Sequence, residues 1–173
     1  MKIRKPNYIV ERFYLTDDGI FPNSKFSVLL YKDVLKIPRL FPALAIKRLF
    51  RSNNWRNAWK NGIFTYHHYH SITHEVLGIY KGRATIQLGG TNGLEVRLQK
   101  GDVLIIPAGV AHKNLDAENA LKCVGAYPEG KDYDMNYGKE GERPKADKNI
   151  AKVKIPATDP VFGSTRGVHR LWK

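Results

Sequence analysis

Four of the six histidines lie within eight residues of one another: His67, His68, His70 and His74. In an extended strand, side chains alternate between two faces, so His68 and His70 point to the same side. Glu75 directly follows the cluster, and His112 begins a segment much further along the chain. Both could approach from neighbouring strands. Three imidazole nitrogens and one carboxylate suit a divalent first-row transition metal with coordination positions left open.

The segments that carry these residues have the pattern of short strands. From Ile63 onward, apolar runs are separated by turns such as Gly89–Gly93 and Pro107–Gly109. Because no helical segment separates these runs, an antiparallel sandwich or barrel is favoured over a parallel sheet. We predict strands at residues 7–15, 26–31, 63–69, 75–80, 83–88, 94–98, 103–106, 111–115 and 121–127.

The flanking segments follow other patterns. Residues 42–51 combine helical spacing of apolar residues with three basic side chains, which predicts a short amphipathic helix. From residue 128 to about residue 149 the chain is polar and rich in Gly, Pro, Lys and Asp, which is typical of a long loop. The apolar tail ends near Trp172, and we expect it to pack on the body or on a second subunit.

The spacing of the chemically useful residues resembles the two sequence motifs of the cupin superfamily. Nine positions agree in order and spacing: Gly62, His68, His70, Glu75 and Gly82, then Gly101, Pro107, Gly109 and His112. The resemblance implies an all-β fold, the double-stranded β-helix or jelly-roll barrel, with a short N-terminal helix. It implies a single domain over residues 1–173, with N-terminal strands and helix in 1–60, the motif-bearing core in about 62–127 and a C-terminal loop and tail in 128–173.

The resemblance also implies a metal site. Its ligands would be His68, His70, Glu75 and His112, holding one divalent ion per chain, with iron, manganese, nickel, zinc and copper all acceptable.

Residues near the ligands carry further expectations. Tyr66 and Asn114 share the strand parity of nearby ligands and are candidates for positioning a substrate, although Tyr66 could equally be aromatic lining. Asp116 stands where the second motif usually has Asn, and Trp55 and Trp59 are expected to be core residues.

Two classes of function fit this site. The first is a metal-dependent enzyme of the oxygenase or isomerase type, acting on a small anionic or oxygen-rich metabolite. The alternative is a non-catalytic cupin that binds or senses a small molecule. A third hypothesis is an interaction module that docks acidic partners through residues 36–60. Members of the superfamily commonly pair, so the resemblance also implies a homodimer.

Composition and charge limit the kinds of partner that we expect this protein to bind. The net charge is +13, and residues 36–60 hold seven basic residues and no acidic one. This segment could lie on an acidic surface or line an anion-binding pocket, but a solvated face on a docked helix is the favoured interpretation. No nucleic-acid-binding motif accompanies the charge, so we expect no nucleic-acid partner. A lone cysteine, Cys123, and the lack of a long apolar segment predict a cytoplasmic protein without a membrane partner.

Overall fold

The computed structural model describes residues 1–3, 9–116 and 120–173, and most of its regular structure is β-strand. The elements in chain order are β1 (Lys2–Ile3), β2 (Ile9–Leu15), β3 (Ser24–Lys32), β4 (Leu35–Lys36), α1 (Pro42–Ser52), β5 (Trp55–Asn61), β6 (Glu75–Lys81), β7 (Arg83–Leu88), β8 (Leu94–Gln99), β9 (Val103–Ile106), β10 (His112–Asn114), β11 (Lys122–Pro128), α2 (Lys145–Ile150) and α3 (Val168–Leu171).

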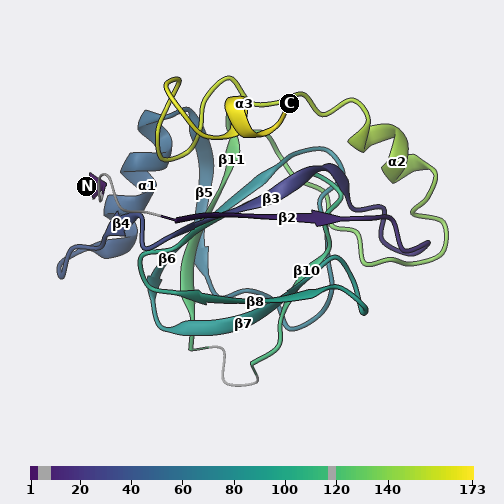
Figure 1. The fold of residues 1–173 in the computed structure, drawn as a ribbon, viewed down its shortest axis with the longest axis horizontal. Helices are drawn as coiled ribbons and strands as arrows, with labels where there is room; N and C mark the ends of the chain where they lie inside the picture. Colours follow the sequence, from purple (N-terminus) through teal and green to yellow (C-terminus); the bar gives the residue numbers. More distant parts are fainter. Residues whose placement is uncertain (4–8, 117–119) are drawn as a thin grey trace.

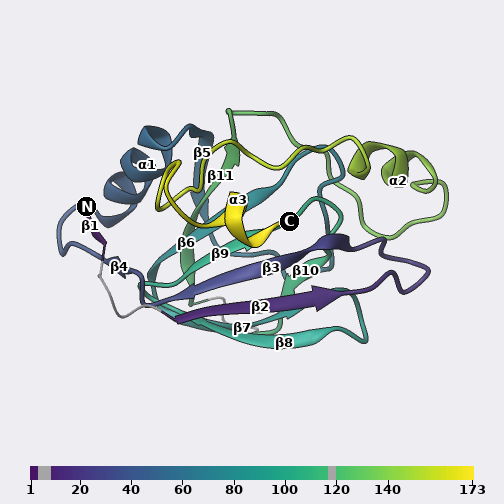
Figure 2. The same cartoon turned by 45° about the horizontal axis from the view of Figure 1, so that its top comes forward.

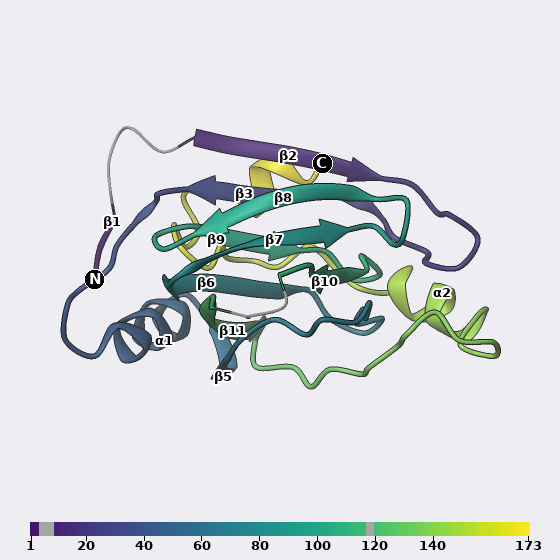
Figure 3. The same cartoon turned by 90° about the horizontal axis from the view of Figure 1, so that it is seen from below.

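Two antiparallel sheets form the body of the molecule. The larger sheet has the order β2-β3-β9-β6-β11-β5, and the smaller has the order β10-β7-β8. Figures 1 and 3 show β7 and β8 lying opposite β3, β9 and β6, so that the two sheets enclose a barrel. Strands β1 and β4 form a separate two-stranded ladder.

Alternation along the central strands creates two hydrophobic layers. Leu30, Leu77 and Leu104 face the barrel interior and pack with side chains of β7 and β8. Their neighbours Tyr31 and Val103 face outward into a second cluster. Strands β3 and β9 are therefore apolar on both faces, because each face of the larger sheet is covered.

The outer face of the larger sheet is covered by α1 and the C-terminal tail (Figure 2). Ile46 and Phe50 of α1 are fully buried there. A Cβ atom at Gly78 would lie 2.9 Å from atoms of both side chains, so glycine in β6 allows the helix to approach. Trp172 is also buried, and its indole N–H donates to the carbonyl of Ser27.

The predicted fold class is confirmed, and so are the helix and the packing of the tail on the body. One prediction is wrong: residues 63–69 form no strand and contribute only isolated bridges at His68 and Tyr69. The strand lies earlier, at Trp55–Asn61, where we predicted none.

Other boundaries differ less. The long polar loop contains the short helix α2. The first two residues of the strand predicted at 7–15 lie outside the described residues. No helix in the described part of the chain is long and apolar enough to cross a membrane.

Candidate functional site

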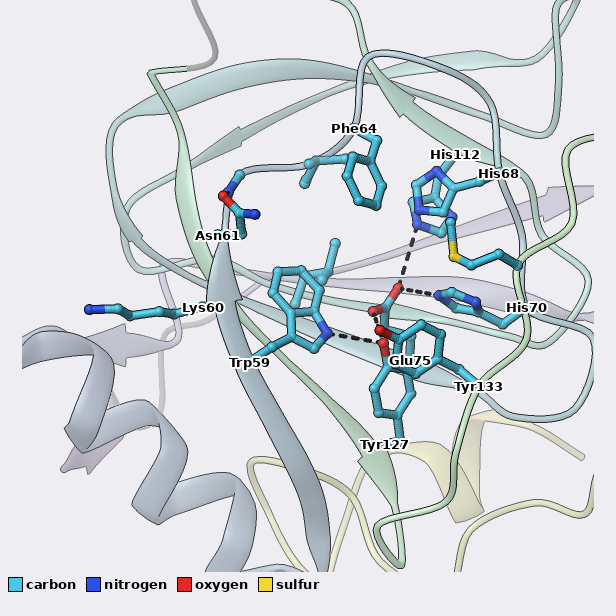
Figure 4. A pocket seen from close by; sticks show the side chains of 14 residues that line it. Trp59, Lys60, Asn61, Phe64, His68, His70, Glu75, His112, Tyr127 and Tyr133 are labelled. Atoms are coloured by element: carbon cyan, nitrogen blue, oxygen red, sulfur yellow. Dashed lines mark hydrogen bonds and ion pairs between the residues drawn. The ribbon is translucent and has the colours of Figure 1, made fainter.

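A cavity of about 200 Å³ lies between the two sheets, and all four predicted metal ligands line it (Figure 4). His68 and His70 lie on the irregular segment that links β5 to β6. Glu75 is the first residue of β6 in the larger sheet, and His112 is the first residue of β10 in the smaller sheet. The barrel therefore brings together side chains from three separate parts of the chain.

The four side chains converge on one region of the cavity wall. Each is at most 5% exposed. The Nε2 atoms of His70 and His112 each lie 3.5 Å from Oε2 of Glu75. The rings of His68 and His112 have centroids 4.1 Å apart. Bridging backbone hydrogen bonds between His68 and His112 fix this pair in place.

The other ring nitrogen of each of these histidines faces a backbone carbonyl. Nδ1 of His68 lies 3.2 Å from the carbonyl oxygen of Tyr66, and Nδ1 of His112 lies 3.2 Å from that of Val110. Nδ1 of His70 contacts the carbonyl oxygen of Asp134. A carbonyl can only accept, so each Nδ1 carries the proton, and in the neutral ring the lone pair is on Nε2. Such carbonyl partners fix the tautomer of metal-binding histidines.

His74 differs from the other three in this respect. Its Nδ1 accepts the backbone N–H of Ala108 at 2.9 Å, and its Nε2 faces the carbonyl of Lys154 at 3.2 Å. Both ring nitrogens are therefore used within the fold. Burial lowers the pKa of His74 to about 4, so this ring is neutral and structural.

Burial and charge act against each other at the cavity wall. Burial and the neighbouring His112 lower the pKa of His68 to about 3. Burial opposes ionisation of Glu75, but the charges and hydrogen bonds of His70 and His112 hold the pKa of its carboxyl below its usual range. Burial also opposes protonation of His70, but the charge of Glu75 raises its pKa. The carboxylate thus attracts a positive charge to the space beside these rings.

The donor atoms have the chemistry of a metal site, but they are not grouped as a formed one. Among the described residues, no set of three or more histidine, cysteine, aspartate or glutamate side chains is arranged as a metal centre. The 3.5 Å separations from Oε2 of Glu75 are nevertheless close to the roughly 3.4 Å expected between two atoms that each lie about 2.1 Å from one tetrahedral ion. The residues present therefore fit a divalent ion.

Aromatic side chains form much of the remaining wall. Trp59 donates its indole N–H to the hydroxyl of Tyr127 at 3.0 Å, and that hydroxyl donates to Oε1 of Glu75 at 3.0 Å. Burial and the charge of Glu75 raise the pKa of Tyr127, so the hydroxyl keeps its proton. Phe64 completes this side of the cavity in Figure 4. Trp59, which we predicted as core, packs against the inner hydrophobic cluster and also lines the cavity.

The loop after β11 crosses beside the cavity and contributes Tyr133 and Met135 to its lining. Asp134 between them is tied down. Its carboxylate accepts the N–H and the hydroxyl of Ser71, the N–H of Ile72 and the side-chain amide of Asn136. Burial opposes ionisation of Asp134, but these hydrogen bonds lower the pKa of its carboxyl. We call residues 131–137 the strap, and sequence reasoning did not identify it as part of the site.

The remaining predicted residues lie outside the cavity lining. Tyr66 is 46% exposed and its ring stacks on Phe64, but it touches a predicted ligand twice: its carbonyl faces Nδ1 of His68, and its ring lies edge-on to the His68 ring with centroids 5.9 Å apart. The side-chain oxygen of Asn114 accepts the N–H of Asp116, and the carboxylate of Asp116 accepts the N–H of Thr85. Asn114 and Asp116 therefore fasten the end of β10 to β7.

The cavity has little positive charge of its own. Among the described residues, Lys60 is the one basic side chain of residues 36–60 that lines the cavity, and Figure 4 shows it pointing away from the histidines. The excess basic charge of residues 36–60 therefore lies mostly outside the cavity.

Three solved structures match parts of this chain. Acireductone dioxygenase from Bacillus anthracis, with a cadmium ion in its active centre, is 14% identical with a TM-score of 0.42, covering 75% of this chain and 83% of that one. YcfD, a ribosomal oxygenase from Escherichia coli, is 20% identical with a TM-score of 0.39, covering 58% and 31%. The pro-11S globulin of pumpkin is 17% identical with a TM-score of 0.38, covering 46% of this chain and only 22% of that one.

Two sequence comparisons identify the family. A curated protein from Bacillus subtilis strain 168, the uncharacterized protein YjlB, is 39% identical over 163 residues, which are 94% of this chain and 96% of that protein. The family model described as Cupin matches residues 45–126, which include both motifs and all four converging side chains. This chain belongs to the cupin superfamily.

Proposed function

We propose that the chain is a metal-dependent enzyme that holds one divalent transition-metal ion through His68, His70, Glu75 and His112. The observation that carries this proposal is the arrangement of nitrogen and oxygen atoms at the site. Each of the three rings donates Nδ1–H to a carbonyl, and two Nε2 atoms face one carboxylate oxygen at 3.5 Å. With Nδ1 donating to a carbonyl, Nε2 is the nitrogen left to face Oε2 of Glu75, and a divalent ion that replaced any proton on Nε2 would be bound by the imidazole nitrogens and the carboxylate together.

The ligand set leaves the identity of the metal open among iron, manganese, nickel, zinc and copper. When bound, such an ion would supply Lewis-acid polarisation of a substrate oxygen or, for iron, chemistry with dioxygen. We favour oxygenase or isomerase chemistry, which would require the ion to expand its coordination beyond the four protein ligands in order to bind a substrate oxygen.

The protein groups around the ligands have separate tasks. Tyr127 holds Oε1 of Glu75 by a hydrogen bond, which leaves Oε2 directed at the histidines. Trp59, Phe64 and Leu77 give the cavity an apolar wall that can support the carbon skeleton of a bound molecule. The strap residue Tyr133 stacks on Tyr127, with ring centroids 4.8 Å apart.

This lining favours a small oxygen-rich molecule as substrate. Its oxygen atoms would face the histidines and Glu75, and its carbon face would rest on the aromatic wall. An anionic group on the substrate would depend on the metal for its positive partner, because Lys60 points away from the cavity.

Metal analysis of matched variants tests the site. The protein is purified without chelator, then dialysed against each candidate ion in turn, and its metal content is measured by elemental analysis. We expect about one ion per chain in the wild type, and a loss of more than about ten-fold in His68→Ala and in His112→Ala. His67→Ala is the matched control, because His67 is adjacent in sequence but does not line the cavity.

Catalysis needs a second measurement. The metal-loaded wild type is incubated with a catechol, an enediol and a hydroxyketone, and dioxygen uptake and products are followed by an oxygen electrode and mass spectrometry. Turnover that is lost in His112→Ala and kept in His67→Ala would support the enzyme. A wild type that stays metal-free after reconstitution would contradict the proposal and favour metal-independent binding of a small molecule.

A further inference from the structure

The turn between β4 and α1 projects from one end of the molecule, away from α2 at the other end (Figures 1 and 2). Leu40 and Phe41 in this turn are 74% and 76% exposed, and Leu44 in the first turn of α1 is 44% exposed. We call these three side chains the apolar tip. Large apolar side chains grouped at a projecting turn are unusual on a surface that meets only water.

The backbone holds the apolar tip in place. Phe41 has φ 50° and ψ 46°, a left-handed conformation that side chains with a bulky ring rarely adopt. Its carbonyl accepts the N–H of Ala45, and Pro42 follows as the first residue of α1. The start of the helix therefore fixes an exposed phenyl ring through a costly backbone conformation, which is typical of contact sites.

Basic side chains surround the apolar tip. The exposed ones between residues 36 and 60 are Lys36, Arg39, Arg48, Arg51, Arg56 and Lys60. Within the described residues none of these six forms an ion pair. Acidic side chains would favour the N-terminal end of α1, yet its first turn has none.

The basic side chains and the apolar tip share one surface. Leu44 borders a shallow depression between α1 and β5 together with Lys47, Arg48, Arg51 and Arg56. The helix residues among them lie at spacings of three and four, so they form one stripe along α1. The basic side chains of α1 and β5 therefore lie directly beside the apolar tip.

We propose that this end of the molecule binds reversibly to an anionic lipid surface. The apolar tip would enter the region between headgroups, and the surrounding cations would contact lipid phosphates. Phe41 and Leu44 border shallow depressions beside α1, but Leu40 and Phe41 remain 74% and 76% exposed on a turn that projects from the molecule (Figure 1). A projecting apolar turn ringed by cations fits a lipid surface better than an acidic protein. The proposal revises our expectation of no membrane partner, which rested on spanning segments alone.

Vesicle flotation of the full chain tests the proposal. Vesicles contain either equal parts of phosphatidylglycerol and phosphatidylcholine or phosphatidylcholine alone. We expect the wild type to float with the anionic vesicles only. The double variant Leu40→Ser/Phe41→Ser removes apolar area and should lower partitioning about ten-fold. Arg48→Glu/Arg51→Glu should lower it by at least about ten-fold, and high salt should act in the same direction.

Matched variants elsewhere separate this surface from general effects. Leu94→Ser removes an exposed leucine from the first position of β8, and Lys148→Glu/Lys152→Glu reverses two exposed charges near α2. Both should float like the wild type. Circular dichroism confirms that every variant is folded.

Three outcomes would overturn the proposal. The first is a wild type that ignores anionic vesicles. The second is a Leu40→Ser/Phe41→Ser variant that partitions like the wild type, which would show charge attraction without insertion. The third is binding to soluble polyglutamate as tight as binding to vesicles, which would indicate an acidic protein as the partner.

Discussion

Two buried carboxylates lie on opposite faces of the larger sheet and have different surroundings. Asp159 in the C-terminal tail accepts hydrogen bonds from the hydroxyl of Tyr31 and from three backbone N–H groups, at distances of 2.7–3.1 Å. Glu75 accepts one hydroxyl at 3.0 Å and otherwise faces two imidazole nitrogens at 3.5 Å. Both side chains are almost fully buried, Asp159 at 0% and Glu75 at 2% exposure, so burial alone does not identify a functional acid. What distinguishes the two is the kind of partner: fixed hydrogen-bond donors surround Asp159, although burial still raises the pKa of its carboxyl, whereas Glu75 faces two imidazole nitrogens that lower its pKa.

The surroundings of Asp159 indicate a structural role. Its two oxygens bind the N–H groups of Val161 and Val168, which belong to the tail that covers the outer face of the larger sheet. Gly167 is required beside it, since a Cβ at this residue would lie 1.9 Å from the carboxylate. Asp159 is thus one buried contact that fastens the tail to the body, beside the hydrogen bond from Trp172 to Ser27.

The largest effect we expect is on stability, from Asp159→Ala. The variant leaves buried N–H groups without this acceptor, so the free energy of unfolding should fall by about 4 kcal/mol. Urea unfolding of the metal-free protein measures the loss. Metal content in the folded variant should equal that of the wild type. A folded Asp159→Ala protein that has lost its metal would contradict the separation of the two carboxylates.

Glu75→Gln should have the opposite pattern. A neutral amide is a poor ligand for a divalent ion and also removes the negative charge that faces His70 and His112. Affinity for the metal should fall by more than about 100-fold, and the free energy of unfolding of the metal-free protein should change by less than about 1 kcal/mol. Competition against a chelator gives the affinity. Unchanged affinity would show that the carboxylate is not a ligand.

Buried histidines can likewise be divided into structural ones and candidate metal ligands. His74 is buried with both ring nitrogens hydrogen-bonded, and its ring lies 4.8 Å from that of Trp172. Burial lowers its pKa from 6.5 to about 4. Between pH 6.5 and about pH 4, His74 is protonated in the unfolded chain and neutral in the folded chain. The free energy of unfolding therefore decreases as the pH is lowered through this range.

This linkage predicts a measurable pH dependence. Between about pH 7.5 and about pH 5, His74 should cost the metal-free protein about 2 kcal/mol of unfolding free energy. Urea unfolding at both pH values compares the wild type with His74→Gln, whose side chain does not titrate. The variant should lose less stability on acidification. Equal losses in both proteins would show that His74 does not couple folding to pH.

The sequence predicted the residues of the site more accurately than it predicted the secondary structure around them. Motif spacing identified His68, His70, Glu75 and His112, and all four line one cavity. The parity argument used a strand at residues 63–69, which does not exist. His68 and His70 face the same cavity because backbone carbonyls fix their rings, and a two-residue period cannot reveal such contacts.

The missed elements have physical reasons. The run Trp55–Asn61 is polar at most positions, and Asn57 has φ 53°, which interrupts the alternation that would have indicated an edge strand. The strap lies in a polar segment with the composition of a mobile loop. Its importance depends on Asp134 reaching Ser71, 63 residues earlier, and sequence spacing carries no sign of that contact.

The smallest predicted effect concerns the strap. The backbone carbonyl of Asp134 orients His70, while its carboxylate ties the strap to Ser71. Asp134→Ala should free the strap and let the ring of His70 turn. Affinity for the metal should then fall about ten-fold, the size expected when an indirect contact is lost. Asp132→Ala is the matched control, because Asp132 is exposed on the same strap.

A role of Asp134 in positioning His70 and a role in overall stability predict different results for Asp134→Ala. If Asp134 only stabilised the protein, Asp134→Ala would lower the free energy of unfolding and leave the affinity of the folded fraction for metal unchanged. If it positions His70, affinity falls while Glu75 and His112 still retain weak binding. Asp134→Asn, which keeps the backbone carbonyl and one acceptor oxygen, should then recover part of the affinity, because the strap remains partly fastened. The strap would then affect metal binding indirectly, by orienting His70 through the backbone carbonyl of Asp134.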